Sequence, residues 1–152
     1  DAVICIHRSM FKYFPNQEKR VFNGFINLDY TKRMQVELVD GMSFLYSGAL
    51  DDIRGADLIP EVIQCLRSKI TDFKLVVTGS GPLEDTIRNW NMPEVDFRGF
   101  LSTSEYDVAL SEADICFVLQ KPDHPFSQGS FPSKCEFYAK HQKPILLLKL
   151  EQ

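Results

Sequence analysis

Hydrophobic and polar positions follow two patterns along this chain. Short apolar runs of about four to eight residues are typical of buried strands, and apolar residues every three or four positions are typical of amphipathic helices. The runs that predict strands cover 2–6, 20–26, 42–48, 73–79, 94–99, 114–120 and 144–148. The periodic segments that predict helices cover 57–70, 81–90, 102–113 and 131–141. Strands and helices therefore alternate from residue 42 onward.

End signals accompany all four helical segments. Asp57 stands where an N-cap is expected for the first helix, and Pro82 stands at the start of the second. Ser102 and Glu105 have the spacing of a capping box at the start of the third. We expect Pro132 in the first turn of the fourth, where its missing N–H costs little.

The alternation predicts an α/β fold. Strands that are apolar throughout indicate a mostly parallel sheet with helices on both faces. Right-handed crossovers make this a doubly wound, Rossmann-like structure. We expect 73–78 and 114–119 among its central strands.

The length of 152 residues corresponds to about one domain. Residues 27–41 carry mixed charges without a clear period, which is typical of a linker or loop. We therefore expect 1–41 to hold the end of a preceding domain, the linker and the first strands. Residues 42–152 then form the compact domain. Because the chain begins without Met, we expect it to be a piece of a longer protein.

Composition and charge argue against several classes of protein. An apolar content of 44% and a charged content of 25% are typical of soluble globular proteins. The net charge of −4 gives no electrostatic basis for binding nucleic acid or an anionic membrane. No stretch has the apolar length that a bilayer-spanning helix needs, and the N-terminal residues do not resemble a targeting segment. We therefore expect a cytoplasmic protein with no nucleic-acid partner.

The four cysteines Cys5, Cys65, Cys116 and Cys135 stand far apart, with no CxxC pair and no Cys/His cluster of metal-ligand spacing. Cys5 and Cys116 fall inside apolar runs, and Cys65 is expected on the apolar side of its helix. These positions favour buried free thiols over disulfides or a catalytic nucleophile. We therefore expect no metal.

Ligands of doubly wound sheets bind beyond the carboxyl ends of the strands. The loops to inspect are therefore 47–56, 79–82, 99–102 and 120–131. In the first loop Gly48 permits a sharp turn, and Arg54 stands just before a helix. Arg54 either reaches a phosphate in the central crevice or pairs with Asp51 or Asp52 at the surface. The loop sequence alone leaves both interpretations open.

The second loop, "TGSGP" at 78–82, has a GxG pattern but lacks the rest of a dinucleotide-binding fingerprint or a Walker motif. It therefore favours a tight strand-to-helix turn over direct phosphate binding. Such a turn at Gly79 would let a ligand approach the backbone closely.

The helix at 131–141 follows the longest of these loops. Its N-terminus offers N–H groups and a positive dipole end suited to a phosphate, and Gly129 permits close approach. Ser133 and Glu136 are three residues apart and share a face. Glu136 lies about one turn inside, where a carboxylate suits two hydroxyls such as those of a ribose. Alternatively it pairs with Lys140 at i,i+4, and the spacing leaves both interpretations open.

Several segments together resemble the C-terminal, donor-binding domain of retaining GT-B glycosyltransferases of glycosyltransferase family 4. The similar segments are "FLYSGALDDIRGADLIPEVI", "FKLVVTGSGPLEDTI", "VDFRGFLSTSEYDVALSEADICFVL" and "FPSKCEFYAKHQKPILL". They cover residues 44–148 in the family's order, which is more specific than any one segment. The stretch "RVFNGFI" resembles the end of the family's N-terminal half.

The resemblance implies roles for individual residues. Glu136 matches the second Glu of the family's E-x7-E motif, which hydrogen-bonds the donor ribose. Gln128 stands where the family has a Glu that faces the donor sugar, so a charge is missing there. We therefore expect Gln128 and Glu136 at the catalytic centre. Arg54 replaces the family's Lys of a diphosphate clamp, and Ala49 stands where the family has a second cation, an Arg.

Other residues match donor-binding elements of the family. The backbone around Arg98, Gly99 and Phe100 matches the element that meets the nucleobase. The remaining donor-binding positions implied by the resemblance are Gly48 and Gly79 in the turns after two strands, and Gly129, Ser130 and Ser133 at the helix start under the diphosphate.

The resemblance implies that 42–152 is the nucleotide-sugar-binding domain of a hexosyltransferase. It would transfer a sugar from a UDP- or GDP-sugar, with retention, to a glycan or lipid-linked acceptor in surface polysaccharide synthesis. An N-terminal domain outside this chain would bind the acceptor, so we expect the isolated chain to be inactive. The full protein is expected in the cytoplasm, associated peripherally with the inner face of the membrane.

No cofactor or metal is expected, because Arg54 and the helix end can carry the diphosphate charge. Two alternatives differ in class from the transferase. Ala49 and Gln128 favour a degenerate, non-catalytic binding module. Another GT-B enzyme, such as a UDP-sugar 2-epimerase, agrees less well with the "PSK-x-x-E-Y" helix.

Overall fold

The computed structural model describes residues 2–5, 18–21, 36–121, 123–125, 127 and 132–147. The strands are β1 (Ala2–Cys5), β2 (Glu18–Val21), β3 (Met42–Ala49), β4 (Phe73–Ser80), β5 (Val95–Gly99), β6 (Ile115–Val118) and β7 (Ile145–Leu147). The helices are the 3-10 helix η2 (Ala56–Leu58), α1 (Ile59–Arg67), α2 (Glu84–Arg88), α3 (Thr103–Glu112) and α4 (Ser133–Lys140).

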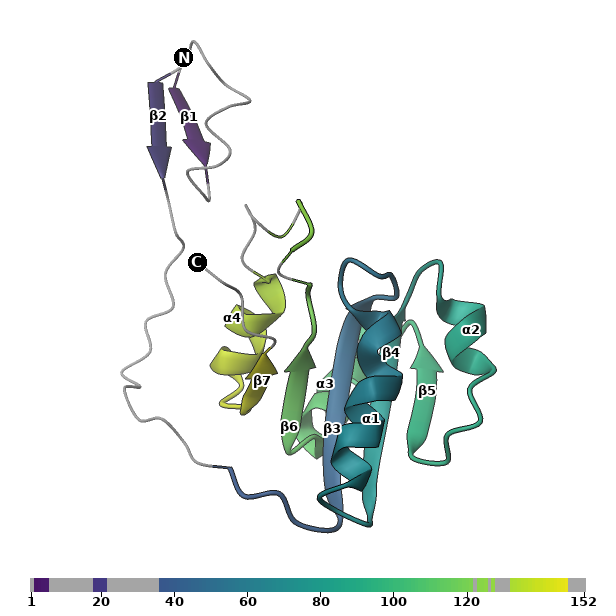
Figure 1. The fold of residues 1–152 in the computed structure, drawn as a ribbon. Coiled ribbons are helices and arrows are strands. Elements are labelled where there is room, and N and C mark those ends of the chain that lie inside the picture. Colours follow the sequence, from purple (N-terminus) through teal and green to yellow (C-terminus); the bar gives the residue numbers. More distant parts are fainter. Residues whose placement is uncertain are drawn as a thin grey trace.

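Within the described residues, β3 to β7 form one sheet in the order β5-β4-β3-β6-β7, and all its pairings are parallel (Figure 1). β1 and β2 form a separate parallel pair. The predicted α/β fold with a parallel sheet is therefore confirmed, as is the interior position of β4 and β6. From β3 the chain adds strands first on one side and then on the other. The carboxyl ends of β3 and β6 consequently border the switch point, where doubly wound sheets bind ligands.

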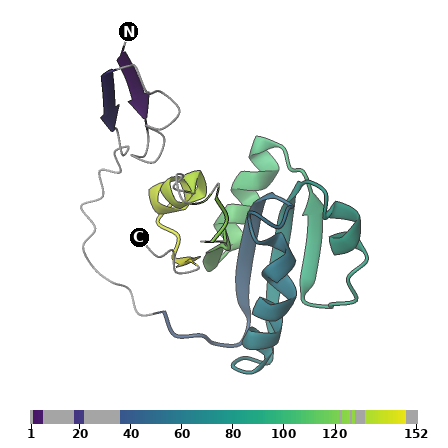
Figure 2. The same cartoon turned by 45° about the horizontal axis from the view of Figure 1, so that its top comes forward.

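Helices cover both faces of the sheet. Because successive side chains of a strand point to opposite faces, neighbouring residues of β3 pack in two different clusters. Phe44 of β3 packs with buried residues of α1 and α2, and its ring stacks on Phe117 with centroids 5.2 Å apart. Leu45, the next residue, packs in a second cluster with α3 and α4. The tilted view shows these two helices on the face away from α1 (Figure 2).

The start of α1 differs from the prediction. Asp57 does not cap α1; it lies inside η2, and its Oδ2 accepts a hydrogen bond from Lys121 Nζ at 2.6 Å. The reason is that Gly55, with a φ of 73°, begins the 3-10 turn before Asp57. The predicted second helix is also shorter than expected, since Pro82 lies in the turn before α2. The capping box at Ser102 and Glu105 is confirmed.

Cys65 is exposed, so the prediction that it lies on the apolar side of α1 is wrong. The buried stripe is formed by Ile59, Ile63 and Leu66, and a residue two positions after Ile63 points away from that stripe. Cys116 and Cys135 are free and buried, as predicted. Burial raises the pKa of the Cys116 thiol to about 12, which makes it a poor nucleophile at neutral pH.

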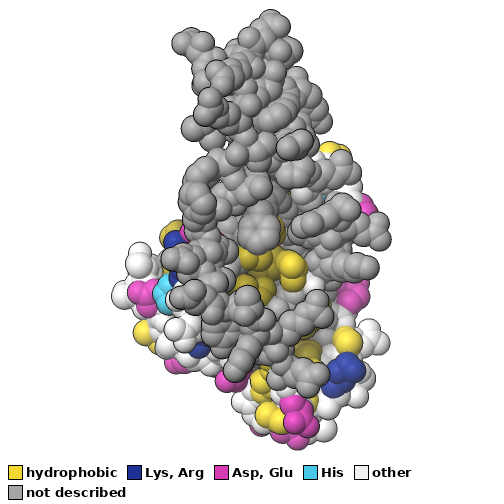
Figure 3. Space-filling view, turned by 90° about the vertical axis from the view of Figure 1, so that its left-hand side faces the viewer, with side chains coloured by type: hydrophobic (Ala, Val, Ile, Leu, Met, Phe, Trp, Pro, Cys, Tyr) yellow, Lys and Arg dark blue, Asp and Glu magenta, His cyan; other side chains and the backbone are white. Residues whose placement is uncertain are grey.

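The sheet edge at β7 is less buried than its aliphatic sequence suggested. Leu146 and Leu147 are 38% and 42% exposed, because among the described strands β7 stands at the edge of the sheet, beside β6 alone. Hydrophobic side chains also show on the side of the molecule where β7 lies (Figure 3). The described part of this run, Ile145–Leu147, therefore forms an edge strand, not a buried one.

Residues 36–41 form no helix or strand, in agreement with the predicted linker, and the proposed boundary between 41 and 42 stays a prediction. In the parts of the chain that the structure describes, no helix has the length and apolar character that a bilayer crossing requires.

Candidate functional site

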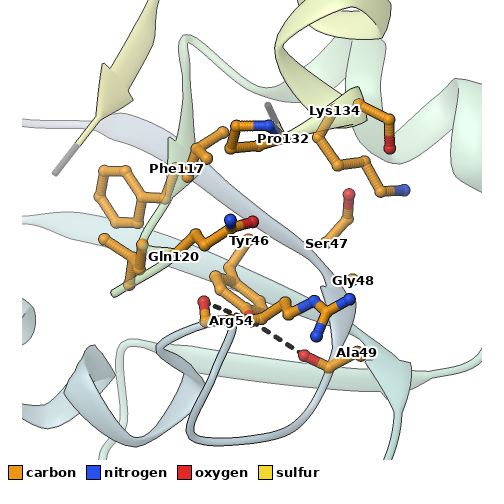
Figure 4. Close-up of a pocket in the computed structure, with 12 residues that line it drawn as sticks. Tyr46, Ser47, Gly48, Ala49, Arg54, Phe117, Gln120, Pro132 and Lys134 are labelled. Atoms are coloured by element: carbon orange, nitrogen blue, oxygen red, sulfur yellow. Dashed lines mark hydrogen bonds between the residues drawn. The ribbon is translucent and has the colours of Figure 1, made fainter. Parts of the chain in front are cut away.

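Two adjoining cavities lie at the carboxyl edge of the sheet, beside the switch point. The smaller has a volume of about 340 Å³, and Arg54, Gln120 and Tyr46 line it (Figure 4). The larger has a volume of about 750 Å³, and its walls include Phe100 and Phe137. Five residues line both cavities and define the cavity junction: Ser47, Gly48, Ala49, Ser133 and Lys134.

The backbone at the floor of the site is tightly packed. Gly48 of β3 pairs with Gly79 of β4, and a Cβ added at Gly79 would overlap the Gly48 carbonyl oxygen. The Leu50 N–H donates to the Ser80 carbonyl at 2.9 Å, and the Leu83 N–H donates to the Leu50 carbonyl at 2.9 Å. These bonds hold Leu50 against the turn between β4 and α2, and the Glu84 N–H donates to the Gly81 carbonyl at 3.0 Å within that turn. The tight strand-to-helix turn predicted from 78–82 is therefore present. Gly79 also lines the larger cavity, so a ligand can reach its backbone.

A hydroxyl network forms the wall behind the cavity junction. Ser47 Oγ lies 2.7 Å from the Tyr138 hydroxyl and 3.0 Å from the Tyr106 hydroxyl. It thereby joins β3 to α4 and α3. Burial raises the pKa of both tyrosines, so both hydroxyls stay protonated at neutral pH. The sequence analysis missed this network; a serine inside the apolar strand "FLYSG" was its local signal.

We expect Ser47→Ala to lower the free energy of unfolding by about 1–3 kcal/mol, because it removes the hydrogen bonds that Ser47 Oγ forms with the Tyr106 and Tyr138 hydroxyls. Urea denaturation followed by circular dichroism measures the change. Ser111→Ala is the matched control: Ser111 is exposed on α3, and its hydroxyl donates to the Val108 carbonyl one turn earlier on the same helix. Its effect should stay within about 0.5 kcal/mol. Equal stabilities for both variants would contradict a stabilising role for the network.

Arg54 has the second of the two arrangements that its loop allowed, the pair with Asp51, and its contact with a phosphate stays a prediction. Its Nη1 lies 3.8 Å from Asp51 Oδ2, while the residue lines the smaller cavity. Its backbone is fixed independently of the guanidinium group. The Arg54 N–H donates to Asp51 Oδ1 at 2.7 Å, and its carbonyl accepts from the Tyr46 hydroxyl at 3.2 Å. The Ala49 carbonyl lies 3.0 Å from the same hydroxyl and shares its single proton, so Tyr46 holds the two ends of this loop together.

Lys134 is a site residue that the sequence analysis did not select. It lies in the first turn of α4 and lines both cavities. Its Nζ sits 5.0 Å from the ring centroid of Tyr106, within the range of a cation–π contact. Burial lowers the pKa of the Lys134 amine. The packing of α4 against α3 places the Lys134 amine over the Tyr106 ring, and a local sequence pattern does not predict that packing.

Glu136 has the second of its two predicted arrangements. Its Oε1 lies 2.7 Å from Lys140 Nζ, and it does not belong to the described lining of either cavity. Its contact with a ribose therefore stays a prediction. Ser133, on the same helix, lies at the cavity junction as the sequence suggested.

The end of β5 and the residue after it lie in different surroundings. Phe100 is 82% exposed and lines the larger cavity, while the Gly99 carbonyl accepts from Thr78 Oγ1 at 2.7 Å. The Arg98 side chain lines neither cavity; its Nε bonds Asp96 Oδ2 at 2.9 Å. The role expected for its backbone stays untested. Gln128, Gly129 and Ser130 lie outside the described residues.

No cluster of three or more His, Cys, Asp or Glu side chains that could hold a metal occurs in the described part of the chain. The site instead offers cationic side chains, hydroxyls, exposed strand ends and aromatic rings. Such a surface suits a ligand with an anionic group and a planar ring.

No protein-family model and no curated protein matches the sequence. Among solved structures, the fold is similar to a mutant of TarM from S. aureus in complex with fondaparinux, alpha-GlcNAc-glycerol and UDP. The TM-score is 0.68 at 14% sequence identity, and the match covers 99% of this chain and 30% of that chain. That protein is a GT-B glycosyltransferase. This chain shares its Rossmann-like fold. At this identity the likeness establishes the fold; membership of family 4 and correspondence to its C-terminal domain stay predictions.

Proposed function

We propose that this chain is the donor-binding domain of a glycosyltransferase that uses a nucleotide-diphosphate sugar. The observation that carries the proposal is the pair of cavities joined at the carboxyl edge of the sheet, in a fold shared with a protein solved with UDP. The aromatic side chains of the larger cavity suit the nucleobase of such a donor, and Arg54 in the smaller cavity suits its diphosphate. The chain spans 30% of that protein's length, so acceptor binding would belong to another domain.

In this proposal the larger cavity holds the nucleobase beside Phe100, and the diphosphate lies near Arg54. Glu136 would exchange Lys140 for the ribose hydroxyls, and Gln128 would face the sugar. Catalysis would rest on positioning and on stabilising the leaving diphosphate. The sugar, from a UDP- or GDP-sugar, would pass with retention to a glycan or lipid-linked acceptor in surface polysaccharide synthesis. The full protein would act in the cytoplasm at the inner face of the membrane.

A ligand-observed NMR screen of UDP, GDP, ADP and their sugars against the 152-residue chain tests the proposal. We expect one nucleoside diphosphate to bind, and to bind at least about tenfold more tightly than its nucleoside, because charge-assisted hydrogen bonds add to the affinity. Calorimetry on the best ligand then gives the dissociation constant. If no nucleotide binds at millimolar concentration, the proposed function is wrong.

A non-catalytic binding module is the second candidate, and Ala49 favours it. Ala49 lines both cavities, so the place where the resembling family has an arginine carries no charge in this site. Donor binding by the full-length protein without donor hydrolysis or sugar transfer would support this candidate. Conversion of a UDP-sugar into its 2-epimer would instead indicate an epimerase.

A further inference from the structure

The cavity junction has one charged side chain. Of the five described residues that line both cavities, four are a serine, a glycine, an alanine and a second serine, and the fifth is Lys134. Arg54 lines the smaller cavity alone, and Asp107 and His141 line the larger cavity alone. A ligand that occupies both cavities must therefore pass through the cavity junction, beside the Lys134 amine.

The surroundings of the Lys134 amine differ from those of neighbouring lysines. Lys140 on the same helix is paired with Glu136, and Lys143 donates to the Ser111 and Ala113 carbonyls. Among the described residues, Lys134 forms no ion pair or hydrogen bond through its amine, and its contact is the face of the Tyr106 ring. A half-buried ammonium group without a counter-charge bears a desolvation cost that a bound anion would offset.

The position of the amine is fixed by the tertiary structure. The Tyr106 hydroxyl is held 3.0 Å from Ser47 Oγ, which anchors the ring beneath the amine at the carboxyl end of β3. In the close-up, the Lys134 side chain reaches from α4 toward the strand end, and Arg54 approaches from the loop after β3 (Figure 4). Two cations from separate elements thus border the same cavity.

We propose that Lys134 binds the phosphate groups that link the two halves of a ligand at the cavity junction, opposite Arg54. The inference rests on the proposed function, and it deepens that function by naming the second cation of the diphosphate site. The ligand class is accordingly one in which an anionic linker separates an aromatic group in the larger cavity from a polar group in the smaller one. Tyr106 acts as a positioning residue for the amine.

Lys134→Met and Lys140→Met form a matched pair for the test. Each keeps the aliphatic stem and removes one positive charge from α4, but Lys140 lies outside both cavities. The probes are inorganic pyrophosphate, UDP or GDP (whichever the wild type binds) and the corresponding nucleoside, measured by calorimetry on the 152-residue chain. Thermal unfolding of each variant checks that it is folded.

We expect Lys134→Met to weaken pyrophosphate and nucleotide binding by about tenfold or more, and nucleoside binding by less than about twofold. Lys140→Met should change the ratio of nucleotide to nucleoside affinity by less than about twofold. Lys134→Arg keeps the charge and should retain most of the phosphate selectivity. Raising the salt concentration should weaken nucleotide binding less in Lys134→Met than in the wild type, because one charge pair is absent.

The outcomes separate this inference from the proposed function. If a nucleotide binds but both Met variants keep the wild-type selectivity, the role of Lys134 is wrong and the proposed function stands. If pyrophosphate binds through Lys134 and no nucleotide binds, the anion site stands and the proposed function is wrong. If the wild type binds neither pyrophosphate nor any nucleotide, both are overturned.

Discussion

Gly55→Ala is expected to lower the free energy of unfolding by about 3–5 kcal/mol. Gly55 has a φ of 73°, which side chains of L-residues rarely adopt. An added Cβ would overlap the Leu119 carbonyl oxygen, which belongs to the backbone just after β6. Backbone atoms cannot rotate away, so the loop would have to move from the sheet.

Gly41→Ala separates the two causes of this cost. Gly41 also has a positive φ, 86°, but no atom lies within 4 Å of the position of an added Cβ. We therefore expect a loss of about 1–2 kcal/mol from conformation alone. Urea denaturation of both variants gives the difference, which measures the close approach of Gly55 to Leu119. Similar losses in both variants would show that this approach does not limit the fold.

The same approach places the candidate site. Gly55 follows Arg54, and the Lys121 N–H donates to the Ile53 carbonyl at 3.1 Å. The loop after β3 is thereby attached to the segment after β6, across the switch point. A variant that displaces the loop should lose nucleotide binding along with stability, whereas Gly41 lies at the opposite end of β3 and should not affect binding.

The fold was predictable because apolar runs and helical periods are local properties of the sequence. The strands at 42–48 and 73–79 reappear within one residue at each end. The predictions for Asp57 and Cys65 failed because a local sequence pattern does not contain the packing that decides where these residues lie. Asp57 had the residue type of a cap, but the turn at Gly55 had already begun a 3-10 helix. Cys65 lay in an apolar helix, but its angle placed it outside the buried stripe.

The candidate site was predictable in its location and less so in its composition. The rule that ligands bind at strand carboxyl ends selected the loops of Gly48 and Gly79, and the start of the last helix together with the family resemblance selected Ser133. All three residues line the cavities. Lys134 and Tyr106 were missed because their contact joins two helices whose mutual orientation is a tertiary property. For Glu136 the sequence allowed two partners, a ribose or Lys140. The structure contains the pair with Lys140 of the same helix.

Arg54→Ala is expected to weaken the binding of a nucleoside diphosphate by about 1.5–3 kcal/mol, or about 10- to 150-fold. The corresponding nucleoside should bind almost as before, because the guanidinium group is proposed to contact the phosphates alone. The substitution should preserve the loop, since the hydrogen bonds from the Arg54 N–H to Asp51 and from Tyr46 to the Arg54 carbonyl use backbone atoms of residue 54. Calorimetric titration of both ligands against wild type and variant measures the two changes.

Arg88→Ala is the matched control for this prediction. Arg88 is exposed on α2, pairs with Glu84 at 3.0 Å and lines neither cavity, so its loss removes the same charge from outside the site. Its effect on either ligand should be less than about twofold, because exposed charges outside the site are screened by salt. Arg54→Lys should recover part of the affinity, since an ammonium group keeps the charge without the two-pronged geometry of arginine. A loss of the same size for nucleoside and diphosphate in Arg54→Ala would instead assign Arg54 to the structure of the loop, and the cation for the phosphates would then be Lys134 alone.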